Sequence, residues 1–196
     1  MVNTPFRIGV LGAPSTGATQ LLRRIEMELR GHGVAVARTG GIAKRAAAAG
    51  LPKMQHHTDT STEWIIGQTI ADEALAARTA QVVLADRAVL DAIPYYTAAL
   101  EYRDDDRVAT ETCLIARRYT TVKYHVLLAT VLDPEIPVDA AHPIDPRYRA
   151  LVDSHLHDEL GTSFLAHSTR RVTSTADSKD AAVQHAVDAA LRAVAA

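Results

Sequence analysis

The chain has 196 residues with 47% hydrophobic and 22% charged side chains, a balance typical of one globular core and not of a disordered chain. Its formal net charge is −2 and no basic run stands out, which argues against a nucleic-acid surface, and no apolar run could span a bilayer. The single cysteine, Cys113, excludes an internal disulfide, and without a signal-like start we expect a cytoplasmic protein.

The first stretch is predicted to form a strand, a turn and a helix. Residues 6–11 are a short apolar run of the kind found in strands that are buried on both faces. Apolar residues at positions 21, 22, 25 and 29 have helical spacing, and Gly31-His32-Gly33 is a helix stop. Between the strand and the helix lies a turn of small residues that ends at Thr19.

This turn is similar to a phosphate-binding loop. Gly12 and Gly17 have the separation of the glycines in G-x-x-x-x-G-K-[ST], and Thr19 falls on the hydroxyl that binds Mg²⁺. The lysine of the motif is absent because position 18 is alanine. Backbone N–H groups and a helix N-terminus can still hold phosphate. The predicted nucleotide-binding residues are Gly12, Ala13, Pro14, Ser15, Thr16, Gly17, Ala18, Thr19 and Gln20.

Three other interpretations of the turn are open. A dinucleotide-binding turn would use Gly9, Gly12 and Gly17, with Arg38 for a 2′-phosphate, although their spacing does not fit G-x-G-x-x-G. A nucleophile elbow would be centred on Ser15. The simplest alternative is a small-residue turn that only begins a helix.

The rest of the chain alternates strands and helices, which predicts an α/β fold with a parallel sheet covered on both faces. Further strands are predicted at residues 34–37, 82–85, 122–130 and 171–173. Helices are predicted at residues 42–49, 62–80, 89–102 with an interruption near Pro94, 110–119, 146–160 and 181–194, and residues 53–61 and 132–145 are predicted as loops. Sites in such sheets lie at the carboxyl ends of the strands, where Gly12, Thr39, Asp86 and Thr130 are expected.

Asp86 follows the apolar run Val82-Val83-Leu84-Ala85, as in a Walker B site. A carboxylate at the end of a strand beside a phosphate loop can hold Mg²⁺ directly or through water. We therefore predict that Thr19 and Asp86 form a metal site.

Taken in order, these segments resemble the small P-loop kinases, and most closely the AAA-type ATPases similar to ribosylnicotinamide and nucleoside kinases. The resemblance rests on the turn, on the helix containing Gln68, and on residues 84–96, 132–137 and 145–149. It implies a three-layer P-loop NTPase fold with a five-stranded parallel sheet. It also implies a single domain over residues 1–196 with a lid-like segment at about residues 130–150.

The resemblance further implies ATP-dependent phosphoryl transfer to a small, nucleoside-like hydroxyl acceptor, with ATP or another nucleoside triphosphate and Mg²⁺. Asp86 and Arg87 take catalytic roles by this likeness, and the predicted substrate-binding residues are Gln68, Asp91, Tyr95, Arg147 and Arg149. The expected partners are the small-molecule acceptor and a second copy of the chain, without nucleic acid or membrane.

Two departures from the family leave enzyme activity open: Ala18 replaces the lysine, and Thr39 stands where many such kinases have an acidic residue. Alongside a kinase, we therefore consider a catalytically impaired P-loop protein that binds nucleotide or a phosphorylated ligand in a regulatory role. An NADP-binding oxidoreductase is the further alternative.

Overall fold

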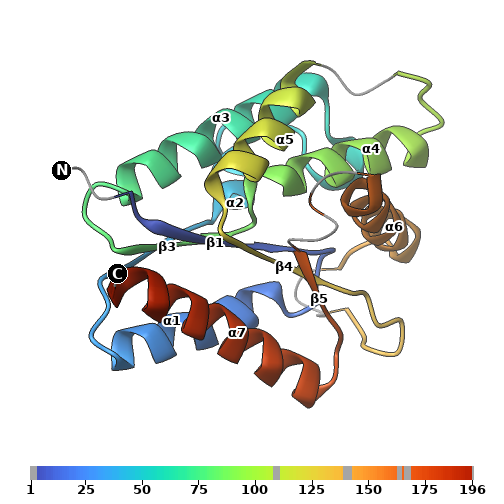
Figure 1. Ribbon diagram of the computed structural model, residues 1–196. Helices are drawn as coiled ribbons and strands as arrows, with labels where there is room; N and C mark the ends of the chain where they lie inside the picture. The colour runs from blue at the N-terminus through green and yellow to red at the C-terminus, as the bar shows by residue number, and fades with distance from the viewer. Residues whose placement is uncertain (1–3, 108–110, 139–142, 163–164, 166–168, 196) are drawn as a thin grey trace.

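The protein is built on five parallel strands in the order β2-β3-β1-β4-β5, seen in a computed structural model that describes residues 4–107, 111–138, 143–162, 165 and 169–195 (Figure 1). The bounds of the strands are β1 Phe6–Leu11, β2 Val36–Thr39, β3 Val82–Asp86, β4 Val126–Thr130 and β5 Thr169–Val172. The expected five-stranded parallel sheet is thus confirmed. The strands run in one direction, so their carboxyl ends meet at one edge of the sheet.

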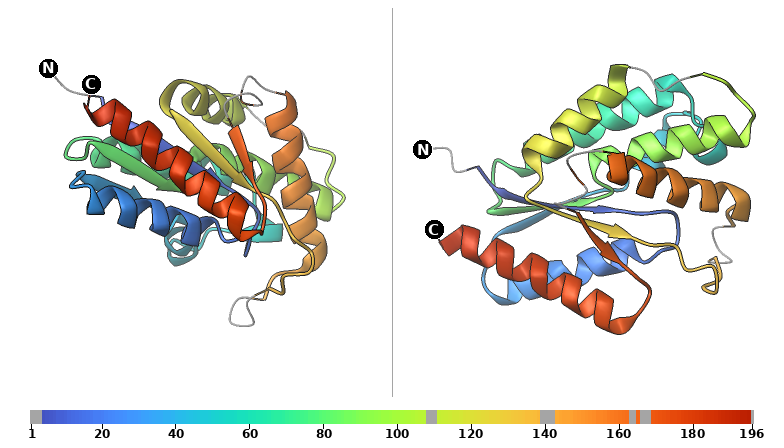
Figure 2. Two further views of the ribbon diagram at one scale, coloured as in Figure 1. Left: turned by 60° about the horizontal axis from the view of Figure 1, so that its bottom comes forward. Right: turned by 45° about the vertical axis from the view of Figure 1, so that its right-hand side comes forward.

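Helices cover both faces of the sheet (Figures 1 and 2). One face packs against α1 and α7, and the other packs against α3, α4, α5 and α6. The bounds of the helices are α1 Ala18–Gly31, α2 Ile42–Ala48, α3 Asp59–Ala76, α4 Ala92–Tyr102, α5 Glu111–Lys123, α6 Pro146–Thr162 and α7 Ala176–Ala195, with single 3₁₀ turns η1 at Met54–His56 and η2 at Val89–Asp91.

Side chains of β1 contribute to the hydrophobic cores on both faces of the sheet, because successive residues of a strand point to opposite faces. Ile8 and Val10 are fully buried against the α1 and α7 side, whereas Leu11 belongs to the core under α3, α4 and α5. A strand buried on both faces explains the nearly continuous apolar run at residues 6–11, in which Arg7 is the one charged residue. No helix in the described ranges is long and apolar enough to cross a membrane.

Several element boundaries differ from the prediction. The helix expected from residue 62 begins at Asp59, because the Thr58 side chain accepts the N–H of Ser61 at 3.3 Å and caps it. The strand expected from residue 122 begins at Val126, since α5 continues to Lys123 and leaves Val122 63% exposed.

The final helix begins at Ala176 rather than at residue 181, and the last strand ends at Val172. Pro94 does not interrupt its helix. It lies in the first turn of α4, where the backbone N–H that proline lacks has no helical partner. Residue 110, where a helix was expected to start, and residues 139–142 of the lid-like segment lie outside the described residues.

Candidate functional site

The predicted phosphate loop connects β1 to α1 at the carboxyl edge of the sheet. Ser15 and Gly17 adopt positive φ values of 59° and 87°, which bend the backbone, and Gly17 is the N-cap of α1. Within the described part of the chain, the N–H groups of residues 15–18 donate no hydrogen bond. Free N–H groups beside a helix N-terminus are the donors that a phosphate group requires, so the loop fits such a group.

Thr130, at the end of β4, fixes the loop from the neighbouring strand. Its hydroxyl shares a hydrogen bond of 2.6 Å with Thr16 and lies 3.1 Å from the carbonyl oxygen of Leu11. A Cβ atom on Gly12 would lie 2.0 Å from the Thr130 hydroxyl, so only glycine fits at this position. The first glycine of the motif therefore reflects a close packing contact.

Thr19 and Asp86 meet as the sequence predicts. The Thr19 hydroxyl donates to Asp86 Oδ1 at 3.0 Å, because β3 lies beside β1 and ends level with the loop. A hydroxyl and a carboxylate are hard oxygen ligands of the kind that Mg²⁺ prefers, so the pair fits a magnesium ion. Metal binding by these two residues stays a prediction.

The N–H and the carbonyl group of Gly12 are both held by the segment that follows β3. Asp91 Oδ1 accepts the N–H of Gly12 at 3.1 Å, and the hydroxyl of Tyr95 donates to its carbonyl oxygen at 3.1 Å. Arg87 donates to the same carbonyl and to Asp91 Oδ2 at 3.0 Å. Burial raises the pKa of Asp91 to about 6, against the opposing effects of Arg87 and of the Gly12 N–H. These residues, predicted to serve catalysis and substrate binding, thus contact the phosphate loop directly.

Arg149 supports the loop from α6. It is only 6% exposed, and its three guanidinium nitrogens donate to the carbonyl oxygens of Pro14 at 2.9 Å, Ile136 at 3.2 Å and Ser15 at 3.3 Å. Arg147 is exposed, and its guanidinium carbon lies 5.2 Å from the centre of the Tyr102 ring. The two arginines of the predicted lid therefore differ: one is built into the loop and the other lies on the surface.

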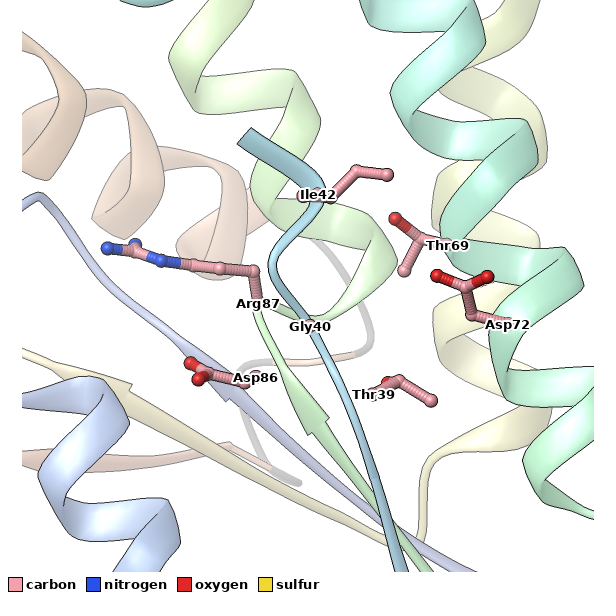
Figure 3. A pocket seen from close by; sticks show the side chains of 7 residues that line it. All are labelled: Thr39, Gly40, Ile42, Thr69, Asp72, Asp86 and Arg87. Carbon is pink, nitrogen blue, oxygen red and sulfur yellow. The ribbon is translucent and has the colours of Figure 1, made fainter. Parts of the chain in front are cut away.

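A narrow pocket, without room for a water molecule in this structure, lies between the ends of β2 and β3 and the helices α2 and α3. Figure 3 shows Thr69 and Asp72 of α3 on one side and Asp86 on the other, with the Arg87 guanidinium extending away from them. The lining residues are Thr39, Gly40, Ile42, Thr69, Asp72, Asp86 and Arg87.

Gln68 does not line this pocket. Its Oε1 accepts a hydrogen bond of 2.8 Å from Arg45, which also donates to Asp72 Oδ2 at 2.5 Å. Sequence reasoning named Gln68 but missed Thr69 and Asp72. Asp72 could have been found from its spacing, since it lies four residues after Gln68 and therefore on the same side of the helix.

Glu73, the neighbour of Asp72, points into the protein and is fully buried. The hydroxyls of Tyr124 and Tyr119 donate to its carboxylate, the second at 3.1 Å, and Arg7 lies 3.7 Å away. Burial raises the pKa of Glu73, against the opposing hydrogen bonds of the two tyrosines. Tyr124 also accepts the N–H of Val89 at 3.1 Å, so this network ties α3 to the turn that follows Arg87.

Two alternative interpretations of the loop do not match the fold. The observed strand order 2-3-1-4-5 is not the order 3-2-1-4-5 of dinucleotide-binding folds, and Arg38 lies 3.6 Å from Glu26. Among the described residues, no hydrogen bond joins Ser15 to a histidine, which a nucleophile elbow would need.

Comparison with known proteins supports the phosphate-loop interpretation. Residues 7–178 match a protein-family profile described as an AAA domain. A search of curated proteins found no match.

Among solved structures, a NadR protein in complex with NAD and AMP-PNP superimposes with a TM-score of 0.66 at 15% identity, covering 94% of this chain and 50% of that chain. A NadR protein in complex with NR gives a TM-score of 0.66 at 14% identity, covering 95% of this chain and 53% of that chain. The chain thus spans about half the length of these proteins, and at such identities the likeness concerns the fold. The family match covers most of the chain, and the loop, the strand order and the aspartate at the end of β3 agree with this match. The protein therefore belongs to the AAA domain family and has a P-loop NTPase fold.

Proposed function

We propose that this protein binds a nucleoside triphosphate with Mg²⁺ in the loop at residues 12–19 and transfers the γ-phosphoryl group to a small hydroxyl acceptor. The proposal rests on the 3.0 Å hydrogen bond between Thr19 and Asp86, beside loop N–H groups that find no acceptor among the residues that the structure describes. AMP-PNP, bound by a NadR protein of similar fold, is an analogue of such a nucleotide.

Arg87 is the best placed of the predicted arginines to replace the missing lysine. Arg149 uses all three nitrogens on backbone carbonyls, whereas Arg87, within the described part of the chain, donates through Nη1 alone, to Gly12 and Asp91. An arginine keeps its charge and can hold phosphate oxygens in a fork. Mg²⁺, when bound by Thr19 and Asp86, would neutralise charge on the phosphates.

The chemistry of the pocket at the ends of β2 and β3 favours an acceptor that donates hydrogen bonds. Carboxylates of Asp72 and Asp86 line it, and the Thr69 hydroxyl already donates to Ile65 at 2.7 Å, so its remaining capacity is to accept. The guanidinium of Arg87 points away (Figure 3). A hydroxyl group can donate a hydrogen bond to these carboxylates. An acceptor that already carries a phosphate group would be repelled by their negative charge.

A second candidate function is nucleotide binding in a regulatory role without efficient transfer. It is favoured by the absence of the lysine at position 18, since losing a preorganised donor to transition-state charge can cost about 10²–10³ in rate. The loop and the metal pair would be used in the same way, so binding alone does not separate the two candidates.

Calorimetry with Mg-ATP, with ATP plus EDTA and with ADP tests the binding step, using the wild type, Asp86→Asn and the control Asp158→Asn at an exposed position of α6. We expect Asp86→Asn to weaken Mg-ATP binding by about tenfold to a hundredfold and to leave the melting temperature without ligand unchanged. Asp158→Asn should behave as the wild type.

No binding at millimolar nucleotide would contradict both candidates. Acceptor-dependent release of ADP, measured with uridine, adenosine and ribosylnicotinamide, separates the kinase from the regulatory protein. Nucleotide binding without ADP release would support the regulatory role.

A further inference from the structure

The end of β2 lacks the carboxylate that the pocket beside it would use to hold an acceptor hydroxyl. Thr39 is the last residue of β2 and lines the pocket, and Gly40 and Ile42 continue the lining. None of these three residues can accept a proton from an attacking hydroxyl at neutral pH. The acceptor side of the pocket therefore depends on another element for a charged acceptor of hydrogen bonds.

Asp72 supplies such a group from α3, on the wall that faces the strand ends (Figure 3). Its side chain is 25% exposed, and Arg45 holds it through Oδ2 at 2.5 Å. Arg45, on α2, also donates to Gln68 at 2.8 Å, so the carboxylate is held as long as α2 keeps this position. In the part of the chain that the structure describes, its other oxygen, Oδ1, accepts no hydrogen bond.

We infer that Asp72 binds and orients the acceptor hydroxyl, in place of an acidic residue at the end of β2; this inference rests on the function proposed above. Asp86 is already joined to Thr19, which assigns the two carboxylates of the pocket to different tasks. Asp86 serves the metal side, and Asp72 serves the acceptor side.

The transfer step follows from this division. The acceptor oxygen forms a bond to the γ-phosphorus while the bond from that phosphorus to the leaving oxygen of ADP breaks, and the hydroxyl proton passes to Asp72. The pocket has no room for a water molecule in this structure, so only the hydroxyl end of the acceptor can enter it, and only once α2 moves aside.

The experiment uses the full chain and the probes uridine, adenosine and ribosylnicotinamide. Affinity for Mg-ATP, affinity for each nucleoside and nucleoside-dependent ADP release are measured for the wild type, Asp72→Asn, and Thr39→Asp combined with Asp72→Asn. Glu63→Gln removes one charge from the exposed side of the same helix and is the matched control. Because the Asp72 and Arg45 side chains are 25% and 41% exposed, we expect all variants to fold, which circular dichroism checks.

We expect Asp72→Asn to lower nucleoside affinity and ADP release at least tenfold, with Mg-ATP affinity within twofold of the wild type. Thr39→Asp in the same chain should restore part of the loss, which a merely structural role of Asp72 would not allow. If the wild type binds a nucleoside and Asp72→Asn binds it equally well, the inference is overturned while the proposed function stands. If Mg-ATP binds and no nucleoside does, the acceptor role of Asp72 is wrong; if Mg-ATP does not bind, the proposed function fails with it.

Discussion

Asp91 accepts the N–H of Gly12 at 3.1 Å, while Arg87, its ion-pair partner at 3.0 Å, donates to the carbonyl of the same glycine. The segment after β3 thus holds both the N–H and the carbonyl group of Gly12, where the phosphate loop begins. The resemblance to kinases assigns Asp91 to the acceptor, but the geometry gives it a second task, which is to hold the loop.

Asp91→Ala should lower the free energy of unfolding by about 1–3 kcal/mol, because it leaves the half-buried Arg87 guanidinium, 28% exposed, and the Gly12 N–H without their acceptor. Asp91→Asn keeps an oxygen that can accept the Gly12 N–H and should cost less. Urea denaturation measures both. If Asp91→Ala is as stable as the wild type and only nucleoside binding is lost, Asp91 is a substrate residue and not a support of the loop.

Ala18→Lys separates the kinase from the regulatory protein. Ala18 is 3% exposed and belongs to the core under α1, so a lysine there has to leave this core to reach a bound phosphate. If Arg87 has not replaced the lysine, Ala18→Lys should tighten ATP binding by about tenfold or more, from roughly 1.5–3 kcal/mol of charge-assisted bonding. If Arg87 has replaced it, Ala18→Lys should change little and Arg87→Gln should abolish ADP release. Turnover that survives Arg87→Gln would exclude the replacement.

Arg149→Met tests the support that α6 gives to the loop. Losing three hydrogen bonds from a charged group to backbone carbonyls should lower stability by at least about 1.5–3 kcal/mol and weaken Mg-ATP binding, since the loop then loses its fixed shape. Arg147→Met, on the same helix, removes an exposed contact with Tyr102 and should cost no more than about 0.5–1 kcal/mol. Equal effects of the two variants on nucleotide affinity would argue against the supporting role.

His57 should make the protein sensitive to acid. Its side chain is 5% exposed, and burial, with the charge of Arg103, lowers its pKa from 6.5 to about 4. The unfolded chain therefore binds the proton first, so this contribution is complete above pH 6.5 and is lost as the pH falls to about 4. The loss amounts to roughly 3 kcal/mol.

Urea denaturation of the wild type and of His57→Phe at several pH values between 7.5 and 4 checks this expectation. Phenylalanine keeps the ring that lies 6.2 Å from Tyr95 and removes the titrating group, so the stability of the variant relative to the wild type should rise as the pH falls. His56→Phe, at the exposed neighbouring position, is the control. A difference between wild type and His57→Phe that does not change with pH would contradict the assignment.

The parts of the site that the sequence could predict are those encoded by neighbouring residues. Gly12, Gly17 and Thr19 form one short motif, and Asp86 ends an apolar strand, so both could be placed without knowing the fold. The hydrogen bonds that hold Gly12 could not be predicted, because their partners Asp91 and Tyr95 lie 79 and 83 residues after Gly12 in the sequence. Only the sheet order brings them together.

The wrong start of the fourth strand and the omission of Asp72 each have a local cause. The β-branched residues at positions 121 and 122 favour a strand by propensity, but α5 continues through them because its opposite side, with Cys113 and Ala116, is buried in the core. Asp72 was missed because the polar positions of a long helix do not show which of them face a pocket.

The adjacent carboxylates of α3 have a mechanical consequence. Asp72 faces the pocket while Glu73, one residue on, is fixed inside by Tyr119 and Tyr124, so α3 cannot turn about its axis without breaking a buried network. α2 has seven residues and lies between glycines at positive φ, Gly41 and Gly50. We therefore expect the space for an acceptor to come from displacement of α2. Backbone amide hydrogen exchange should then be faster in α2 than in α3. Equal protection of the two helices would show that α2 is not displaced more easily than α3.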